Sequence, residues 1–183
     1  MLCEKPLGIS VAETEEILAA ADAAGLPLVE AFKYRFGPFP DRVRELVSSG
    51  ALDAPAVVSA DGVIGTTGVD EDASAVLDLG GIRARVSTSI TRTLPRAATI
   101  RGARGEIEIP NVWGSRIEST ATAVLHREDG TREEIATGSV SPMAAEADAT
   151  IAALREGRTE APEMPWRETL ATARLLAEWR SVL

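Results

Sequence analysis

The stretch LCEKPLGISVAETEEILAAADAAGLPLVEAF, residues 2–32, decides the fold. It opens with a short apolar run that ends in the charged pair Glu4-Lys5. Ser10-Val-Ala-Glu13 then has the pattern of a capping box, in which each side chain binds a free N–H at the start of a helix. Apolar residues recur at helical spacing up to Gly25, and residues 27–32 favour a second strand. Strand, helix and strand in this order predict a βαβ unit and therefore a parallel sheet.

The chain changes character after a second helix, which we expect from Pro38 or Pro40 to Ser49. Short alternating strands follow, with turns at 80–81, 102–105 and 128–130, and they predict an antiparallel meander. Two more helices are expected, from Ser141 to Gly157 and from Trp166 to Leu183. The predicted fold class is α/β with α+β character: a βαβ edge, then a mostly antiparallel open sheet with helices packed on one face.

The composition excludes several classes of function. Of the 183 residues, 45% are hydrophobic, which is enough to bury a core, and the formal net charge is −9. An acidic chain repels phosphate backbones, so we expect no nucleic-acid partner. No apolar run approaches the roughly 20 residues of a membrane-spanning helix, so we expect no membrane partner. The N-terminus lacks the pattern of a signal peptide, and the expected location is the cytoplasm.

The sequence has one cysteine, Cys3, and one histidine, His126. One cysteine forms no intramolecular disulfide and no Cys-rich metal site, so no metal is expected. We interpret Cys3 as a small buried hydrophobe and His126 as an exposed residue at a strand end. The acidic run Asp70–Asp72 is interpreted as a solvated loop rather than a cation site.

The first candidate site residues are Glu4-Lys5-Pro6, at the end of the first strand. Ligands of open α/β sheets bind in the crevice beyond the carboxyl ends of the strands. A lysine in that crevice donates a hydrogen bond or places positive charge beside a developing alkoxide. Pro6 fixes the turn that aims Lys5, and a cis peptide bond before the proline is one way to form such a turn. The alternative is an ion pair on a surface loop.

The second strand ends in a similar way, with Lys33-Tyr34-Arg35. Tyr34 is the single tyrosine of the sequence, and a tyrosine between two cations could act as an acid or bind a polar ligand. The alternative is a solvated loop whose aromatic ring covers the core.

The glycines at 62, 65 and 68 invite comparison with a nucleotide-binding turn. Such a turn opens a helix whose N-terminus binds a pyrophosphate, but here Asp70, Glu71 and Asp72 follow and would repel it. We interpret the three glycines as loop residues.

Three stretches in order carry a resemblance to a known family: Leu2–Gly8 with its Glu-Lys-Pro, Glu30–Phe36, and Arg42–Gly50. Together with 67–71, 102–106 and the last two helices, they resemble the Gfo/Idh/MocA family of NAD(P)-dependent oxidoreductases. The most similar branch is that of dihydrodiol or sugar dehydrogenases. The resemblance implies a Rossmann domain remnant over 1–36 and, over 37–183, a substrate and oligomerisation domain that lacks a segment near 52–56.

The resemblance also implies a site. Lys5 and Tyr34 would be catalytic, Glu4, Lys5, Pro6 and Arg35 would contact the cofactor, and that cofactor would be NAD or NADP. The partners implied are a sugar- or diol-like small molecule and a second copy of the chain bound through the sheet face.

Two parts of the family pattern are missing from the sequence: the glycine-rich turn before Leu2, and a segment with a catalytic Asp and a His or Tyr after Gly50. We therefore expect a chain shortened at its N-terminus and internally. The expected function is hydride transfer between a nicotinamide and a sugar- or diol-like alcohol carbon, with this chain alone expected to be inactive or incomplete. The alternative is a non-catalytic remnant that serves as an oligomerisation or ligand-binding module.

Overall fold

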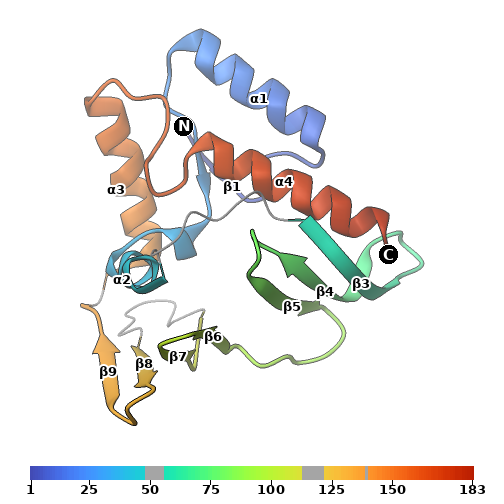
Figure 1. The fold of residues 1–183 in the computed structure, drawn as a ribbon. Coiled ribbons are helices and arrows are strands. Elements are labelled where there is room, and N and C mark those ends of the chain that lie inside the picture. The colour runs from blue at the N-terminus through green and yellow to red at the C-terminus, as the bar shows by residue number, and fades with distance from the viewer. Residues whose placement is uncertain (48–55, 113–121, 139) are drawn as a thin grey trace.

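A computed structural model describes residues 1–47, 56–112, 122–138 and 140–183. The predicted α/β class is confirmed: one parallel pair of strands, two antiparallel sheets and the helices between them make up the fold (Figure 1).

The predicted βαβ unit is present. Strands β1 (Leu2–Glu4) and β2 (Val29–Ala31) are parallel, and α1 (Val11–Ala24) connects them. The capping box forms at the start of α1, where the Glu13 N–H donates to the Ser10 hydroxyl at 3.1 Å. The Glu13 carboxylate in turn accepts from the N–H of Ile9 at 2.6 Å. At the other end Gly25 takes a left-handed conformation with φ of 62°, which ends the helix as predicted.

The antiparallel part forms two sheets rather than the single open sheet expected. The first contains β3 (Ala56–Ile64), β4 (Asp70–Asp78) and β5 (Arg83–Ser89). The second contains β6 (Ala98–Gly102), β7 (Gly105–Ile109), β8 (Thr122–Arg127) and β9 (Arg132–Ala136). All three predicted hairpins are present. Turn residues predict which strands pair as hairpins, but not whether β5 continues to β6, and the described residues show no such pairing.

Two interpretations of the β3–β4 region were wrong. Gly62 lies inside β3 rather than in a loop, where a Cβ atom would stand 2.7 Å from the backbone oxygen of Asp72. The strand pair therefore approaches closely because Gly62 has no side chain. The acidic run Asp70–Asp72 lies in β4 rather than in a loop, and Arg92 donates to Asp72 with 3.0 Å between Nη2 and Oδ1. Gly65 and Gly68 lie in the turn between the two strands, as predicted.

Helices cover both faces of the β1–β2 pair. Leu28 packs with α1 and with α4 (Trp166–Ser181), through Leu18 and Leu170. Its neighbour Val29 packs with Ala145 and Ala149 of α3 (Pro142–Arg155). Because successive strand residues point to opposite faces, α1 and α4 lie on one side of the pair and α3 on the other, as Figure 1 shows. The core around residues 1–36 thus draws on residues from both predicted domains.

The remaining elements connect these layers. A short 3-10 helix, η1 (Lys33–Arg35), follows β2, and α2 (Pro38–Val47) comes next. Phe39 and Val43 of α2 pack against the buried residues of the second sheet, among them Ile107 and Ile135. The predicted end of this helix at Ser49 and the segment 52–55 lie outside the described residues. No helix among the described residues has the length and apolar character needed to cross a bilayer.

Candidate functional site

The carboxyl ends of β1 and β2 bring the two predicted groups of site residues to one edge. Glu4 pairs with Ala31 in the parallel register, so Lys5 and Pro6 leave β1 where Phe32 and Lys33 leave β2. Lys5 and Pro6 are exposed, and the peptide bond between them is cis. The parallel pairing of β1 and β2 therefore places a charged residue, Lys5, beyond the carboxyl ends of the strands, as the sequence predicts.

Glu146, a residue of α3, joins this edge from the other side. Its side chain is buried, with 4% of the residue exposed, and its Oε2 atom has no hydrogen-bond partner among the described residues. Burial raises the pKa of Glu146, the carboxylate of Glu4 raises it further, and the ammonium of Lys33 lowers it. The protonated form of a carboxylic acid is favoured wherever the charged form is desolvated. The edge thus contains a buried acid that interacts electrostatically with a carboxylate and with a cation.

Lys33 also contacts Tyr34. The Lys33 ammonium lies 4.8 Å from the centre of the Tyr34 ring, within the range of a cation–π contact. Four residues, Glu4, Lys33, Tyr34 and Glu146, are therefore grouped at the carboxyl ends of β1 and β2; we call them the edge cluster.

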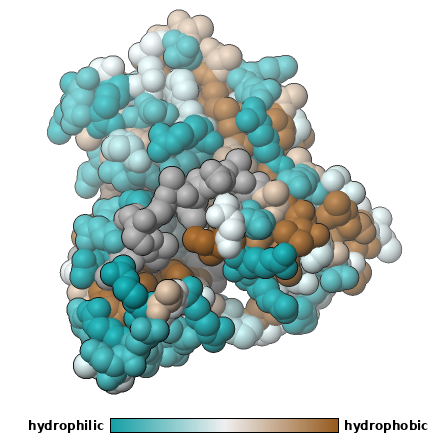
Figure 2. Space-filling model, viewed as in Figure 1, coloured by the Kyte–Doolittle hydropathy of each residue, from teal (hydrophilic) through white to brown (hydrophobic). Residues whose placement is uncertain are grey.

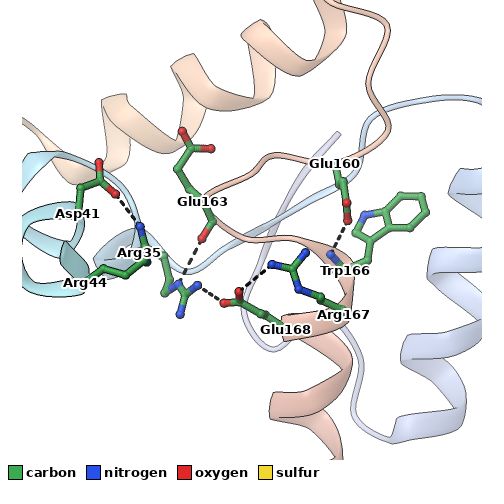
Figure 3. A network of polar contacts seen from close by, with 8 residues as sticks. All are labelled: Arg35, Asp41, Arg44, Glu160, Glu163, Trp166, Arg167 and Glu168. Carbon is green, nitrogen blue, oxygen red and sulfur yellow. Dashed lines mark hydrogen bonds and ion pairs between the residues drawn. The ribbon is translucent and has the colours of Figure 1, made fainter. Parts of the chain in front are cut away.

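Arg35 turns toward α4. Its guanidinium forms an ion pair with Glu168, and its Nε donates to the carbonyl oxygen of Glu163 at 3.2 Å. Figure 3 shows this network, with Arg167 on the far side of Glu168; nearby, the backbone N–H of Trp166 donates to the carboxylate of Glu160. The role of Arg35 in cofactor binding stays a prediction, and its contacts here are with the start of α4.

Glu30 stabilises the turn that presents Lys5. It is a β2 residue, 7% exposed, and its Oε1 atom accepts a hydrogen bond from the N–H of Leu7 at 3.1 Å. Leu7 follows Lys5 by two residues, so a buried carboxylate fixes the course of the chain just after the candidate lysine.

Sequence reasoning missed both Glu30 and Glu146. A signal for each was present, because each is a charged residue at a position where the pattern requires an apolar one. Glu30 stands within the apolar run 28–32, and Glu146 stands seven residues before the fully buried Ala153, on the same stripe of α3. Charged residues are almost never fully buried without a partner or a function.

Other candidates lie elsewhere. His126 is a β8 residue with 44% of its side chain exposed, 3.5 Å from Glu108, as expected of an exposed strand-end residue. Cys3 is half-buried and packs with Leu7 and Leu28. Within the described part of the chain, no group of three or more His, Cys, Asp or Glu residues could hold a metal ion.

Comparison with known proteins gives two kinds of result. No family model matches the sequence. Among curated relatives, trans-1,2-dihydrobenzene-1,2-diol dehydrogenase of Mus musculus is 26% identical over 239 residues, covering 100% of this chain and 70% of the mouse enzyme. The scyllo-inositol 2-dehydrogenase (NADP(+)) IolU of Bacillus subtilis is 27% identical over 233 residues, with 98% and 69% covered.

Solved structures share the fold. KijD10, a 3-ketoreductase from Actinomadura kijaniata determined with NADP and TDP-benzene, superposes with a TM-score of 0.84 at 17% identity. The superposition covers 99% of this chain and 70% of KijD10. The fold is thus that of NADP-binding oxidoreductases. In sequence the chain is similar to oxidoreductases of the Gfo/Idh/MocA family, and it shares their fold.

The length of the match agrees with the expected internal shortening. The mouse relative is matched over 239 residues and this chain has 183, so the relative has additional residues within the matched stretch. Where they would be inserted stays a prediction, and the expected position near 52–56 falls almost wholly outside the described residues.

The residues present fit a nicotinamide cofactor in part. An exposed lysine beyond the end of a parallel strand suits the nicotinamide side. A pyrophosphate requires a glycine-rich strand–turn–helix, and the 183 residues contain no G-x-G-x-x-G. Lys5 thus lies where open α/β sheets bind ligands, whereas these 183 residues contain no turn of the kind that binds a pyrophosphate.

Proposed function

We propose that this chain forms the substrate and nicotinamide side of an oxidoreductase site that acts on a sugar- or diol-like alcohol with NADP or NAD. The observation that carries the proposal is the exposed Lys5 beyond the end of β1, at the same edge as the edge cluster. A diol dehydrogenase and an NADP-dependent inositol dehydrogenase among its relatives support the class of substrate and the cofactor.

The chemistry assigns one role to each group. The nicotinamide supplies the hydride acceptor or donor. Lys5 donates a hydrogen bond to the substrate oxygen and so stabilises negative charge that develops there. For the alcohol to become the ketone, its C–H hydrogen would leave as hydride to the bound nicotinamide and its hydroxyl proton would pass to water, with Tyr34 as the proposed acid or base in that proton transfer. Glu4, Pro6 and Arg35 are the proposed remaining contacts of the cofactor.

A direct assay tests this proposal. The chain is incubated with about 10 mM NADP, far above a typical Km, and with diols and sugars, while reduced cofactor is followed by absorbance. We expect slow turnover that falls at least 100-fold in Lys5→Met, a size typical of losing one charge-stabilising donor. No turnover by the wild type, or equal turnover by Lys5→Met, would overturn the assignment. Arg132→Met serves as the control for loss of a cation, because Arg132 is an exposed residue of β9, in a different sheet from this edge.

The missing pyrophosphate turn leads to a second, finer proposal: the chain alone binds the cofactor weakly. We expect a Kd for NADPH above about 1 mM, equivalent to a binding free energy weaker than about −4 kcal/mol. Nicotinamide fluorescence measures it. A micromolar Kd would show that the residues present suffice and that the chain is not incomplete.

The domain division at 36/37, a cytoplasmic location and self-association through a sheet face remain proposals. One observation favours self-association: Ile82 and Ile90, which flank β5, are 50% and 74% exposed. If the chain is instead a non-catalytic oligomerisation module, light scattering will show a stable dimer or larger assembly. A strict monomer at about 100 µM, a concentration at which interfaces weaker than typical specific ones dissociate, would exclude that role.

A further inference from the structure

A cavity of about 190 Å³ lies between the β1–α1 loop and α4, and no residue of the edge cluster lines it. Its lining from α4 follows one face of the helix: Thr169, Thr172, Ala173, Leu176, Ala177 and Arg180. From the first to the last of these residues the helix rises about 16 Å. So small a volume along about three turns of a helix makes the cavity a narrow slot, which suits one extended chain better than a ring.

Buried polar side chains gather at this slot. The described part of the chain has four buried polar or charged residues, and three of them, Thr14, Glu30 and Thr169, line the slot. The Thr14 hydroxyl already donates to the carbonyl oxygen of Ser10 at 2.8 Å. Glu30 is the one of the three that can carry a charge, so it decides which ligands the slot favours.

Glu30 has one carboxylate oxygen in use and one without a partner. The residue is 7% exposed, and its Oε1 accepts from the N–H of Leu7 at 3.1 Å. Its Oε2 is buried and has no hydrogen-bond partner among the described residues. A buried polar atom without a partner costs free energy, and a ligand that brings a donor into the slot removes that cost. A cationic donor gains most, because charge-assisted hydrogen bonds are roughly twice as strong as neutral ones.

Glu30 lies toward the Thr169 end of the slot. The indole N–H of Trp166, in the first turn of α4, donates to the carbonyl oxygen of Leu28 at 2.8 Å. Leu28 precedes Glu30 by two residues, so the two share one side of the extended chain. Thr169 follows Trp166 by about one helical turn. The carboxylate and the Thr169 hydroxyl therefore form the polar end of the slot.

The opposite end of the slot carries a cation, Arg180. Its side chain is 53% exposed, so this end is the open one. The guanidinium is already partnered: it donates to the carbonyl oxygen of Gly68 and lies 3.4 Å from the carboxylate of Asp70. A ligand with a cation beside Glu30 therefore points its other end toward a second cation, and an uncharged tail is favoured there.

The walls between the two ends are apolar. Leu7 is buried, and Ile9 and Leu176 are 93% and 49% exposed, so apolar side chains line both the interior and the rim. Figure 2 shows hydrophobic surface, in brown, at the right of the view, where Figure 1 places the C-terminal end of α4 and β3. An aliphatic chain in the slot gains from the burial of its methylene groups.

We propose that the slot binds a linear aliphatic primary amine in its ammonium form, as a ligand other than the substrate. The ammonium donates to the Glu30 carboxylate and to the Thr169 hydroxyl, and the alkyl chain lies along Leu7, Ala173 and Leu176. An ammonium has three donors, enough for both polar groups at this end. This inference goes beyond the proposed function and does not depend on it, because it involves neither Lys5 nor a nicotinamide.

Three probes of the same length test the choice of head group: pentylamine, 1-pentanol and pentanoate. Each is titrated into the whole chain at about pH 7, where an alkylammonium keeps its charge, and followed by backbone amide NMR shifts. We expect the amine to bind at least tenfold more tightly than the alcohol, with shifts at Leu7, Glu30 and Ala173, and no saturation by pentanoate. Equal binding of amine and alcohol would overturn the proposal. No saturation by the amine would also overturn it and would leave water as the occupant.

The net charge of −9 attracts any cation, so a control for unspecific attraction is needed. The diamine 1,5-diaminopentane has the same chain and twice the charge. In the slot its second ammonium would lose water among apolar walls, so we expect it to bind more weakly than pentylamine. Unspecific attraction predicts the reverse order, and equal or tighter binding of the diamine would contradict the site.

Two variants locate the bound amine. Glu30→Gln keeps an oxygen for the N–H of Leu7 and removes the charge, and we expect pentylamine binding to weaken at least tenfold. Glu163→Gln is the matched control, since Glu163 also has a buried carboxylate oxygen without a partner among the described residues but does not line the slot. Amine binding reduced alike by both variants, or by neither, would contradict the role of Glu30.

A filled slot supplies an arm that leaves the carboxylate in place. Ala173→Leu adds three carbons to the α4 wall, and we expect it to weaken amine binding at least tenfold. Ala144→Leu is its control, because Ala144 is an exposed residue of α3 that does not line the slot. Thermal melting verifies that all four variants are folded. Unchanged amine binding in Ala173→Leu would show that the slot is not the site.

Discussion

Arg35, the last residue of the short helix η1 that follows β2, forms an ion pair with Glu168 of α4, although the two are 133 positions apart in the chain. The same guanidinium donates to the carbonyl oxygen of Glu163. Arg35 therefore joins the predicted cofactor-binding segment to the last helix. Glu168, the partner of Arg35, lies in the first turn of α4, two residues after Trp166. The indole N–H of Trp166 donates to the carbonyl oxygen of Leu28, so this turn is also bound to the chain just before β2.

Replacing Arg35 with alanine tests this connection. About a third of each side chain in the pair is exposed, so the charges are partly screened by water. With the carbonyl bond also lost, we expect a decrease of about 1 kcal/mol in the free energy of unfolding. Urea denaturation measures it. Arg44→Ala is the control, because its pair with Asp41 is about half exposed, and a change within about 0.5 kcal/mol is expected. Equal losses would contradict a structural role for Arg35.

The β1–α1–β2 unit could be predicted from the sequence because its signals are local. Ser10, Glu13 and Gly25 fix the ends of the helix through neighbouring backbone groups. The division into two antiparallel sheets could not be predicted, because the neighbour of β5 is decided by packing among distant segments. Gly62 was misplaced for the same reason: its close approach to β4 depends on the partner strand.

The candidate site was predictable to the same degree. The placement of Lys5 and Tyr34 at one edge could be predicted because each follows the end of a strand, and a parallel pair places such ends together; their roles stay predictions. Glu146 is supplied by a helix that begins more than a hundred residues later, and no local pattern says which strand that helix covers. The ion pair of Arg35 with Glu168 could not be predicted for the same reason, because its two residues are 133 positions apart in the chain.

Gly8 provides a prediction about the loop that presents Lys5. A Cβ atom at this position would lie 2.8 Å from Thr14 Oγ1 and 2.9 Å from its backbone nitrogen. The backbone of α1 has little freedom to move, so we expect Gly8→Ala to destabilise the fold by about 1–3 kcal/mol. Gly138→Ala is the control, with no atom within 4 Å of the added carbon. If both variants melt at the wild-type temperature, the loop is not tightly packed on α1.

Glu30 should tolerate replacement by glutamine better than by alanine. Glutamine keeps an oxygen for the N–H of Leu7, whereas alanine leaves this buried donor without a partner, at a cost of about 1–3 kcal/mol. We expect Glu30→Ala to lose stability by that amount and Glu30→Gln to lose much less, as measured by chemical denaturation. Amide exchange at Leu7 gives a local test: it should accelerate in Glu30→Ala. An unchanged rate there would show that the bond does not hold the turn.

Glu146 makes stability depend on pH in a defined direction. Burial and the carboxylate of Glu4 raise its pKa above the usual value of 4.5 that applies to the unfolded chain. Between that value and the raised one, the folded chain keeps a proton that the unfolded chain has lost. The contribution of Glu146 is therefore favourable at low pH and is lost as the pH rises through the raised pKa.

Glu146→Gln removes this titration without changing the shape of the side chain. We expect the variant and the wild type to have similar stability near pH 4, where the acid is protonated in both states. As the pH rises to 8, the variant should become the more stable, because the wild type must then bury a carboxylate beside Glu4. Unfolding by urea at several pH values measures the difference in unfolding free energy between the two proteins, in which the titrations of all other groups cancel.

Two neighbouring residues provide controls for this pH-dependent difference in unfolding free energy. Glu4→Gln should reduce it, since it removes the repulsion, whereas Lys33→Met should enlarge it by removing the cation that favours the charged form. A difference that stays constant from pH 4 to 8 would show that Glu146 does not titrate in the edge cluster.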